Sequence, residues 1–283
     1  MKQMILKMMC ILGSALFLFG AAAAEPAGDP LRVTFFDVGK GDCILVSRGG
    51  CSVMIDTGYA ETADNVAAAM RQQGIDHLDA LILTHYDRDH VGGIEAILRA
   101  FPAEHIYIPG YDGSDKIYTA AAWALQQSGL DTEKVTADVS FTLSEVRFTV
   151  FATSLAYIPG EGKEEGNDND VSLVVSIRYG NDSFLLAGDI EKEGIDSFLA
   201  AGHGTYDVVK MPHHGQNEKN TDDFIARVGM KIAVITDGEE EPVKKKVMKL
   251  LTASGAEIYT SATNGDITIT GTGNGTYDVV TER

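Results

Sequence analysis

The chain has 283 residues, 45% of them hydrophobic, and a formal net charge of −18 at pH 7. A chain of this length and composition can bury a substantial core and can form one large domain. The acidity argues against a dedicated binder of long nucleic acids, because a polyanion would be repelled unless basic patches or bound cations offset the charge. It leaves open a hydrolase of small-molecule esters or short oligonucleotides.

The first 24 residues have the pattern of a secretory signal peptide. Lys2 and Lys7 give a basic start, residues 11–19 an apolar centre, and residues 22–24 a small-residue cleavage site. We predict cleavage after Ala24, a linker over 25–30, and a single folded domain over 31–283. An uncleaved membrane anchor is the alternative, but the apolar centre is short for spanning a bilayer. The mature protein is therefore expected to lack a membrane span and to be secreted or held in the cell envelope.

The next predicted elements are three strands in "LRVTFFDVGKGDCILVSRGGCSVMIDTG". The second and third strands form a hairpin whose turn is expected to centre on Arg48 and Gly49. This register sets Cys51 opposite Val46 and leaves Cys43 out of reach of Cys51. We therefore expect two thiols rather than a disulfide.

Strand and helix patterns then alternate to the end of the chain. A run of strands followed by strand–helix alternation occurs twice, which predicts a mixed α/β fold of two packed sheets with helices outside. The predicted elements are a helix over 62–74, a strand over 81–83, a helix over 94–101, a strand over 104–110, a helix over 114–129, hairpins over 139–153 and 171–189, a helix over 192–202, a strand within 206–215, a helix over 221–229, a strand within 231–238, a helix over 243–255, a strand over 257–260 and a hairpin over 266–280.

The stretch "LILTHYDRDHVGG", residues 81–93, places four metal-ligand residues between a buried strand and a helix. This is the position at which open α/β sheets bind ligands. Two imidazoles and two carboxylates suit zinc, manganese or iron better than calcium, which prefers oxygen ligands. The alternative is a solvated polar turn with an N-cap aspartate. The four residues are His85, Asp87, Asp89 and His90.

Further polar side chains follow other apolar strands. Asp56 ends "VMID", Asp189 ends "FLLAGD", and His213 and His214 follow "DVVKMP". Each alone could be a turn former or a surface residue, but together they could converge at one sheet edge. A pair of metals needs about six protein ligands, one of them a bridging carboxylate. That number is supplied by His85, Asp87, Asp89, His90, Asp189 and one histidine of the 213–214 pair.

The motifs together resemble a known family. "FFDVGKGDCILV", "MIDTG", "LILTHYDRDHVGG", "NDNDVSLVVSIRYGNDSFLLAGDI" and "DVVKMPHHG" are similar, in this order, to blocks of metallo-β-lactamase-fold hydrolases, and most closely to the soluble hydrolase domain of ComEC-type competence proteins. The resemblance covers nearly everything after residue 30. It implies a four-layer αβ/βα sandwich with a two-metal site at one edge of the sheets.

The resemblance also implies roles for individual residues. Asp189 would bridge the two metals, and Asp56 would orient a metal-bound histidine. The first metal would be held by His85, Asp87 and Asp189, and the second by Asp89, His90, Asp189 and a histidine of the pair. We expect His213 to be that ligand, because it is the first histidine out of the strand.

Two positions depart from the family pattern. Asp87 stands where the family usually has a second histidine, which shifts the metal preference towards harder ions such as manganese. The histidine that usually precedes the middle hairpin is also missing, since "NDND" occupies its place. Asp168, Asn169 or water could complete the first metal's ligands. The expected cofactors are therefore two divalent transition-metal ions, zinc or manganese.

The expected mechanism is hydrolysis by a bridging hydroxide that the two metals generate. Asp89 could accept a proton from the nucleophile, and His214 could donate one to the leaving group. An exported phosphodiesterase or nuclease-type enzyme is favoured, acting on small-molecule or short oligonucleotide esters. A hydrolase of carbon esters, lactones or amides is the first alternative, and a non-catalytic binding module is the second.

Overall fold

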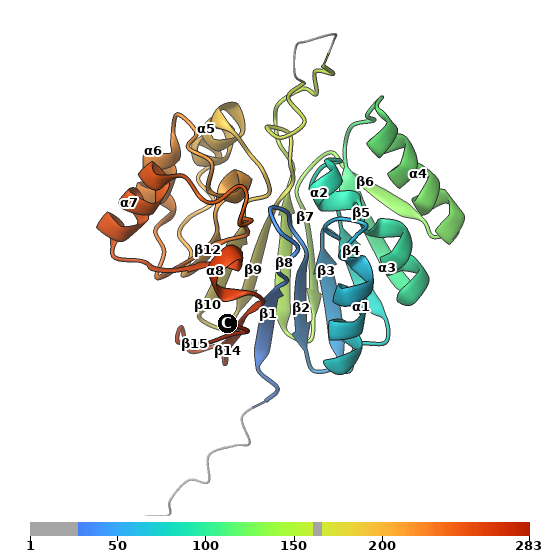
Figure 1. The fold of residues 1–283 in the computed structure, drawn as a ribbon, viewed down its shortest axis with the longest axis horizontal. Helices are drawn as coiled ribbons and strands as arrows, with labels where there is room; N and C mark the ends of the chain where they lie inside the picture. The colour runs from blue at the N-terminus through green and yellow to red at the C-terminus, as the bar shows by residue number, and fades with distance from the viewer. Residues whose placement is uncertain (1–27, 161–165) are drawn as a thin grey trace, which may run out of the picture.

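The computed structural model describes residues 28–160 and 166–283. Two β-sheets face each other, and helices cover their outer sides (Figure 1). The eight-stranded sheet has the order β15 (Tyr277–Thr281), β14 (Ile267–Gly271), β1 (Leu31–Phe35), β2 (Ile44–Arg48), β3 (Cys51–Ile55), β4 (Leu78–Ile82), β5 (Ala103–Pro109) and β6 (Thr132–Val135). The seven-stranded sheet has the order β13 (Glu257–Thr260), β12 (Ile232–Ile235), β11 (Val208–Lys210), β10 (Asp182–Leu186), β9 (Val174–Tyr179), β8 (Val146–Phe151) and β7 (Val139–Leu143).

The helices form the two outer layers. One side carries α1 (Ala63–Gln72), α3 (Ile94–Ala100) and α4 (Lys116–Ser128), and the other carries α5 (Lys192–Ala201), α6 (Thr221–Val228) and α7 (Lys245–Ser254) (Figure 1). Three short helical segments lie in the connections: α2 (Arg88–Val91), η1 (Pro212–Gly215) and α8 (Ser261–Asn264). The predicted four-layer αβ/βα sandwich is confirmed.

The main core lies between the two sheets. Alternating side chains of β8 point inward, so that Val146, Phe148 and Val150 are buried while Arg147 is exposed. Phe148 belongs to a core cluster that contains apolar residues of both sheets, among them Phe35. Two further cores lie between the sheets and the outer helices, one for each sheet. Because the central strands are packed on both faces, they hold the strand ends of the site in place.

The first hairpin turns one residue later than expected. Arg48 pairs with Cys51, so the turn consists of Gly49 and Gly50 rather than Arg48 and Gly49. Both glycines have positive φ, 58° and 83°, and a two-residue turn of this kind needs left-handed conformations that arginine disfavours. Cys43 and Cys51 are free thiols, as expected.

The N-terminal predictions fall mostly beyond the described residues. The signal peptide over 1–24 and the first part of the linker lie outside the range that the structure describes. Within the described ranges, no helix has both the length and the apolar character needed to span a bilayer.

The topology brings several strand ends to one edge. β3, β4 and β5 run parallel in the first sheet, and β10, β11 and β12 run parallel in the second. The carboxyl ends of parallel strands meet at the same edge of a sheet, where ligands bind in α/β folds. The residues that follow β3, β4, β10 and β11 carry the predicted ligands.

Candidate metal centre

A buried hydrogen-bond network behind the site orients His90. Asp56 follows β3 and is fully buried. Its carboxylate accepts hydrogen bonds from the Thr84 backbone N–H at 2.8 Å and from Thr84 Oγ1 at 2.7 Å. His90 Nδ1 lies 2.8 Å from Asp56 Oδ2, and because a carboxylate only accepts, Nδ1 carries the proton. In the neutral form of His90 the lone pair is therefore on Nε2, which faces the site.

Two threonines orient His85 and His214 in the same way. Thr84 Oγ1 donates its only proton to Asp56, so it accepts a hydrogen bond from His85 Nδ1 at 3.0 Å. Thr236 follows β12, donates to Asp42 Oδ1 at 2.6 Å, and accepts from His214 Nδ1 at 3.1 Å. In their neutral forms, both histidines therefore present the lone pair of Nε2 to the site. This is the arrangement by which outer residues orient metal-bound histidines.

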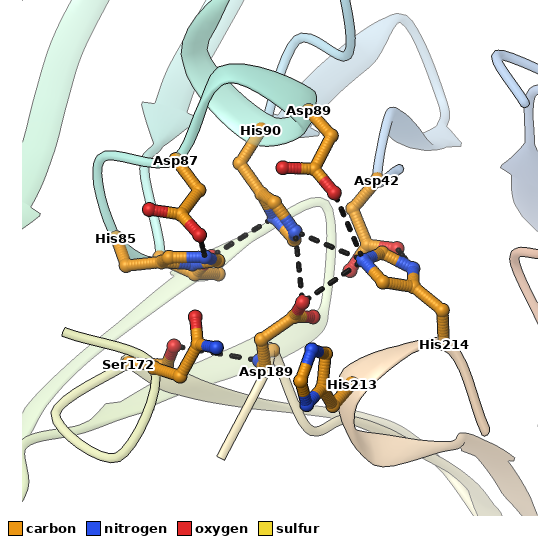
Figure 2. Close-up of polar contacts among 12 residues, drawn as sticks. Asp42, His85, Asp87, Asp89, His90, Ser172, Asp189, His213 and His214 are labelled. Atoms are coloured by element: carbon orange, nitrogen blue, oxygen red, sulfur yellow. Dashed lines mark hydrogen bonds and ion pairs between the residues drawn. The ribbon is translucent and has the colours of Figure 1, made fainter. Parts of the chain in front are cut away.

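Four residues form a tight cluster at the sheet edge: Asp89, His90, Asp189 and His214 (Figure 2). His90 Nε2 and His214 Nε2 are 3.3 Å apart. Asp189 Oδ2 lies 3.3 Å from the first nitrogen and 2.9 Å from the second, and Asp89 Oδ2 lies 3.4 Å from His214 Nε2. Ligands about 2.1 Å from a tetrahedral zinc are about 3.4 Å from one another. The cluster has the spacing of the ligands of one cation.

The pKa values of the cluster also favour a cation. Burial alone would lower the pKa of His90, but the carboxylates of Asp189 and Asp56 raise it well above its usual value. Burial alone would raise the pKa of Asp189, but His214, His90 and Lys210 hold it well below its usual range. Positive charge is stabilised at this position, whether a proton or a metal ion carries it.

The second expected ligand group is partly assembled. His85 Nε2 is buried without a hydrogen-bond partner and lies 3.7 Å from Asp87 Oδ2. Asp168 interacts with Asp87, and burial and the Asp87 carboxylate raise the pKa of Asp168 to about 6. Two adjacent carboxyl groups that share a proton can share a metal instead. Among the described residues, neither His85 nor Asp87 makes an ion pair with Asp189.

His213, which we expected as a ligand, lies apart from the cluster. His213 lies to one side of it, and His214 occupies the position that we expected for His213 (Figure 2). Both histidines have left-handed backbones, with φ of 44° and 50°, inside the short η1 turn. This conformation directs the second ring, not the first, towards Asp189. Asn169 donates from Nδ2 to Glu191 Oε1 at 3.0 Å.

Comparison with known proteins decides the family. Residues 36–236, well over half of the chain, match the family described as "Metallo-beta-lactamase superfamily". The chain belongs to this superfamily. It is a metal-dependent hydrolase of the metallo-beta-lactamase superfamily, and the aspartates and histidines above are its candidate ligands for divalent metal ions.

The relatives include competence and recombination proteins. ComE operon protein 3 of Bacillus subtilis is 27% identical over 282 residues, covering 91% of this chain and 34% of the relative. Recombination protein 2 of Haemophilus influenzae is 25% identical over 272 residues, covering 92% of this chain and 31% of the relative. The chain thus spans about a third of each relative's length. The resemblance to ComEC-type proteins is confirmed.

A solved structure shares the fold. The metallo-beta-lactamase fold protein YhfI from Bacillus subtilis superimposes with a TM-score of 0.59 at 16% identity, covering 86% of this chain and 100% of that chain. This likeness supports the superfamily's four-layer architecture.

A buried lysine of the site, Lys210, was not predicted from the sequence. Lys210, the last residue of β11, is fully buried. Its Nζ lies 2.6 Å from Asp42 Oδ2 and 3.2 Å from Asp189 Oδ1, and donates to Gly188 O at 3.0 Å. Burial lowers the pKa of Lys210, but the two aspartates outweigh it and raise that pKa. The sequence feature that could have indicated its burial is a single lysine within the apolar run "DVVKMP".

The glycine pair after the ligand loop allows close packing. A Cβ on Gly93 would lie 2.4 Å from the Thr57 carbonyl oxygen. Gly93 N donates to Gly58 O at 2.9 Å, and Thr57 N to His90 O at 2.7 Å. Only glycine fits between the segment after β3 and the start of α3. This contact fixes the ligand loop against Asp56.

Proposed function

We propose that the protein is an exported phosphodiesterase that hydrolyses small-molecule or short oligonucleotide esters with two zinc or manganese ions. The observation that carries this proposal is the carboxylate-rich composition of the site. Six buried or half-buried aspartates surround it against one buried lysine and three histidines. The six are Asp42, Asp56, Asp87, Asp89, Asp168 and Asp189. Such an excess of negative charge requires cations, and oxygen-rich pairs of metals are typical of enzymes that cleave phosphate esters.

The proposed ligands follow from the placements above. One ion would be held by His85, Asp87 and Asp189, with Asp168 within reach of the same ion, and the other by Asp89, His90, Asp189 and His214. We therefore assign His214 the ligand role first expected for His213. When bound, the two ions would activate water and neutralise the charge that develops on the phosphoryl oxygens.

The chain's own residues hold and orient this machinery. Burial raises the pKa of Asp89, but His214 and His90 outweigh it and lower that pKa, so its carboxylate stays ionised and can accept a proton or hydrogen bond from the attacking water. Lys210 holds one oxygen of Asp189, which leaves Oδ2 directed at His90 and His214. With His214 among the ligands, we no longer propose it as the general acid.

Two observations favour phosphate esters over carbon esters. Asp87 increases the share of oxygen ligands, which suits harder ions. Two of the relatives that match most of the chain are named for recombination and competence. Because the chain covers only about a third of those proteins, we propose a related chemistry and not their whole activity.

The test is a panel of substrates with the purified protein in zinc or manganese. Bis-p-nitrophenyl phosphate and a short single-stranded oligonucleotide are expected to be cleaved, and a chelator should stop the reaction because the site's own side chains lack the cationic charge to replace the ions. A lactone and nitrocefin should be turned over far more slowly. Faster turnover of the lactone would assign a carbon-ester hydrolase, and no turnover with any substrate would favour a binding module.

We further propose that the hydrolase domain over 31–283 is exported after cleavage of residues 1–24. The basic start, apolar centre and small residues of this segment support it. N-terminal sequencing of protein from the envelope or medium should begin at Glu25. A chain that begins at Met1 and is confined to the cytoplasmic fraction would refute export.

A further inference from the structure

A further group of metal-ligand side chains lies beside the proposed dinuclear site and shares no residue with it. Glu191, His213 and Glu218 each offer one ligand atom, and the three atoms lie within 4.8 Å of one another. We propose that these residues bind a further divalent cation, zinc or manganese, which fastens the loop that carries His214. This site goes beyond the proposed hydrolysis, because it needs none of the ligands of the dinuclear centre.

The geometry around His213 is that of a metal ligand rather than a hydrogen-bonded ion pair. Its Nδ1 lies 3.3 Å from Glu191 Oε1 and 3.4 Å from Glu218 Oε1. This nitrogen is buried, yet it has no hydrogen-bond partner. Hydrogen bonds from nitrogen to a carboxylate are usually about 2.7–2.9 Å long. Ligands of one tetrahedral zinc are about 3.4 Å apart, which is the spacing observed.

The burial of the three side chains suits an ion that keeps some water. The side chains of His213, Glu218 and Glu191 are 17%, 21% and 37% exposed. One imidazole and two carboxylates match the ligand preferences of zinc and manganese. With three protein ligands, the remaining coordination positions would be filled by water from the open side.

The surrounding structure holds two of these ligands in place. Asn169 Nδ2 donates to Glu191 Oε1 at 3.0 Å, which fixes the carboxylate next to His213. The oxygen of that amide, Asn169 Oδ1, is buried without a hydrogen-bond partner. His213 has a left-handed backbone with φ of 44° and donates its backbone N–H to Gly188 O at 3.2 Å. Uncommon backbone conformations of this kind are concentrated at functional sites.

The three ligands come from three separate segments. Glu191 is the N-cap of α5, His213 lies in η1, and Glu218 precedes α6. A cation would therefore join the starts of two helices to the turn that carries His214. Because an ion that binds only the folded protein stabilises it, this site would raise the thermal stability and restrict the turn beside the dinuclear centre.

The experiment compares the number of bound ions. The wild-type protein, E218Q and the exposed control E240Q are each equilibrated with zinc, desalted and assayed by elemental analysis. E218Q should hold one ion fewer per chain than the wild type, and E240Q the same number as the wild type. The zinc-dependent rise in melting temperature should be smaller in E218Q. Equal zinc content in E218Q and the wild type would overturn the proposal.

A second measurement needs no variant. Crystals of the wild-type protein soaked in zinc should show an anomalous scattering peak between His213 Nδ1 and the two glutamates, separate from the peaks near Asp189. The same soak without any peak at that position would show that the histidine is a protonated partner of two carboxylates, and would overturn the proposal even if E218Q failed to fold. Loss of phosphodiesterase activity has no bearing on this outcome, so the two proposals fail separately.

Discussion

Replacing Asp189 with alanine is expected to cause the largest loss of activity of any single substitution. Its Oδ2 atom contacts both His90 Nε2 and His214 Nε2, and its Oδ1 contacts Lys210 Nζ. It is the proposed bridge between the two ions, so its loss removes a ligand from each. We expect kcat/KM for bis-p-nitrophenyl phosphate to fall by more than the roughly 10–100-fold typical of losing an outer hydrogen-bond partner.

The measurement combines kinetics with elemental analysis. The variant should bind fewer ions at the dinuclear centre, and excess zinc or manganese should not restore wild-type turnover. Asp278→Ala, on the exposed face of β15, serves as the matched control and should behave as the wild type. Asp189→Asn keeps the side-chain volume and separates the loss of a ligand from the loss of packing. A variant with wild-type metal content and turnover would exclude Asp189 as the bridge.

Replacing Lys210 with methionine is expected to destabilise the fold strongly. The lysine is fully buried between the carboxylates of Asp42 and Asp189. Removing one partner of a buried ion pair leaves uncompensated charge in a region of low dielectric constant. The expected cost is about 3–5 kcal/mol in the free energy of unfolding, measured by urea denaturation in the presence of a chelator.

A double variant tests the cause. Asp42→Asn removes one of the two stranded charges and keeps an oxygen that can accept from Thr236. The double variant Lys210→Met with Asp42→Asn should therefore lose less stability than the sum of the two single variants. If the effects are additive, or if Lys210→Met costs less than about 1 kcal/mol, the surrounding charges are not coupled through this lysine.

Sequence reasoning worked best where local pattern and topology agree. The four ligand residues of "LILTHYDRDHVGG" follow one buried strand, and Asp189 follows another. Their meeting at one edge was therefore predictable from the rule for parallel strand ends. The two-sheet architecture was predictable for the same reason, since alternation of strands and helices occurs twice. Both depend on periodicity, which a single sequence displays directly.

Features that depend on exact backbone conformation were not predictable. The choice between His213 and His214 rests on two left-handed residues in a turn that is too short to leave a pattern. The first hairpin shifted because two glycines, not one, form its turn. Lys210 read as an ordinary basic residue, because its two acidic partners lie far away in the sequence and reach it only when the sheets pack together.

The origin of the ligands in both halves of the chain has a consequence for how the enzyme matures. His90 and Asp56 are 34 positions apart, but His90 and His214 are 124 positions apart. Closing so long a segment costs entropy that only completed packing repays, so contacts of this kind form late in folding. A nascent chain that still lacks Asp189 and His214 would have only two of the four clustered residues, and we expect it to be inactive. We therefore expect metal binding and activity to require Asp189 and His214, which the final third of the chain supplies.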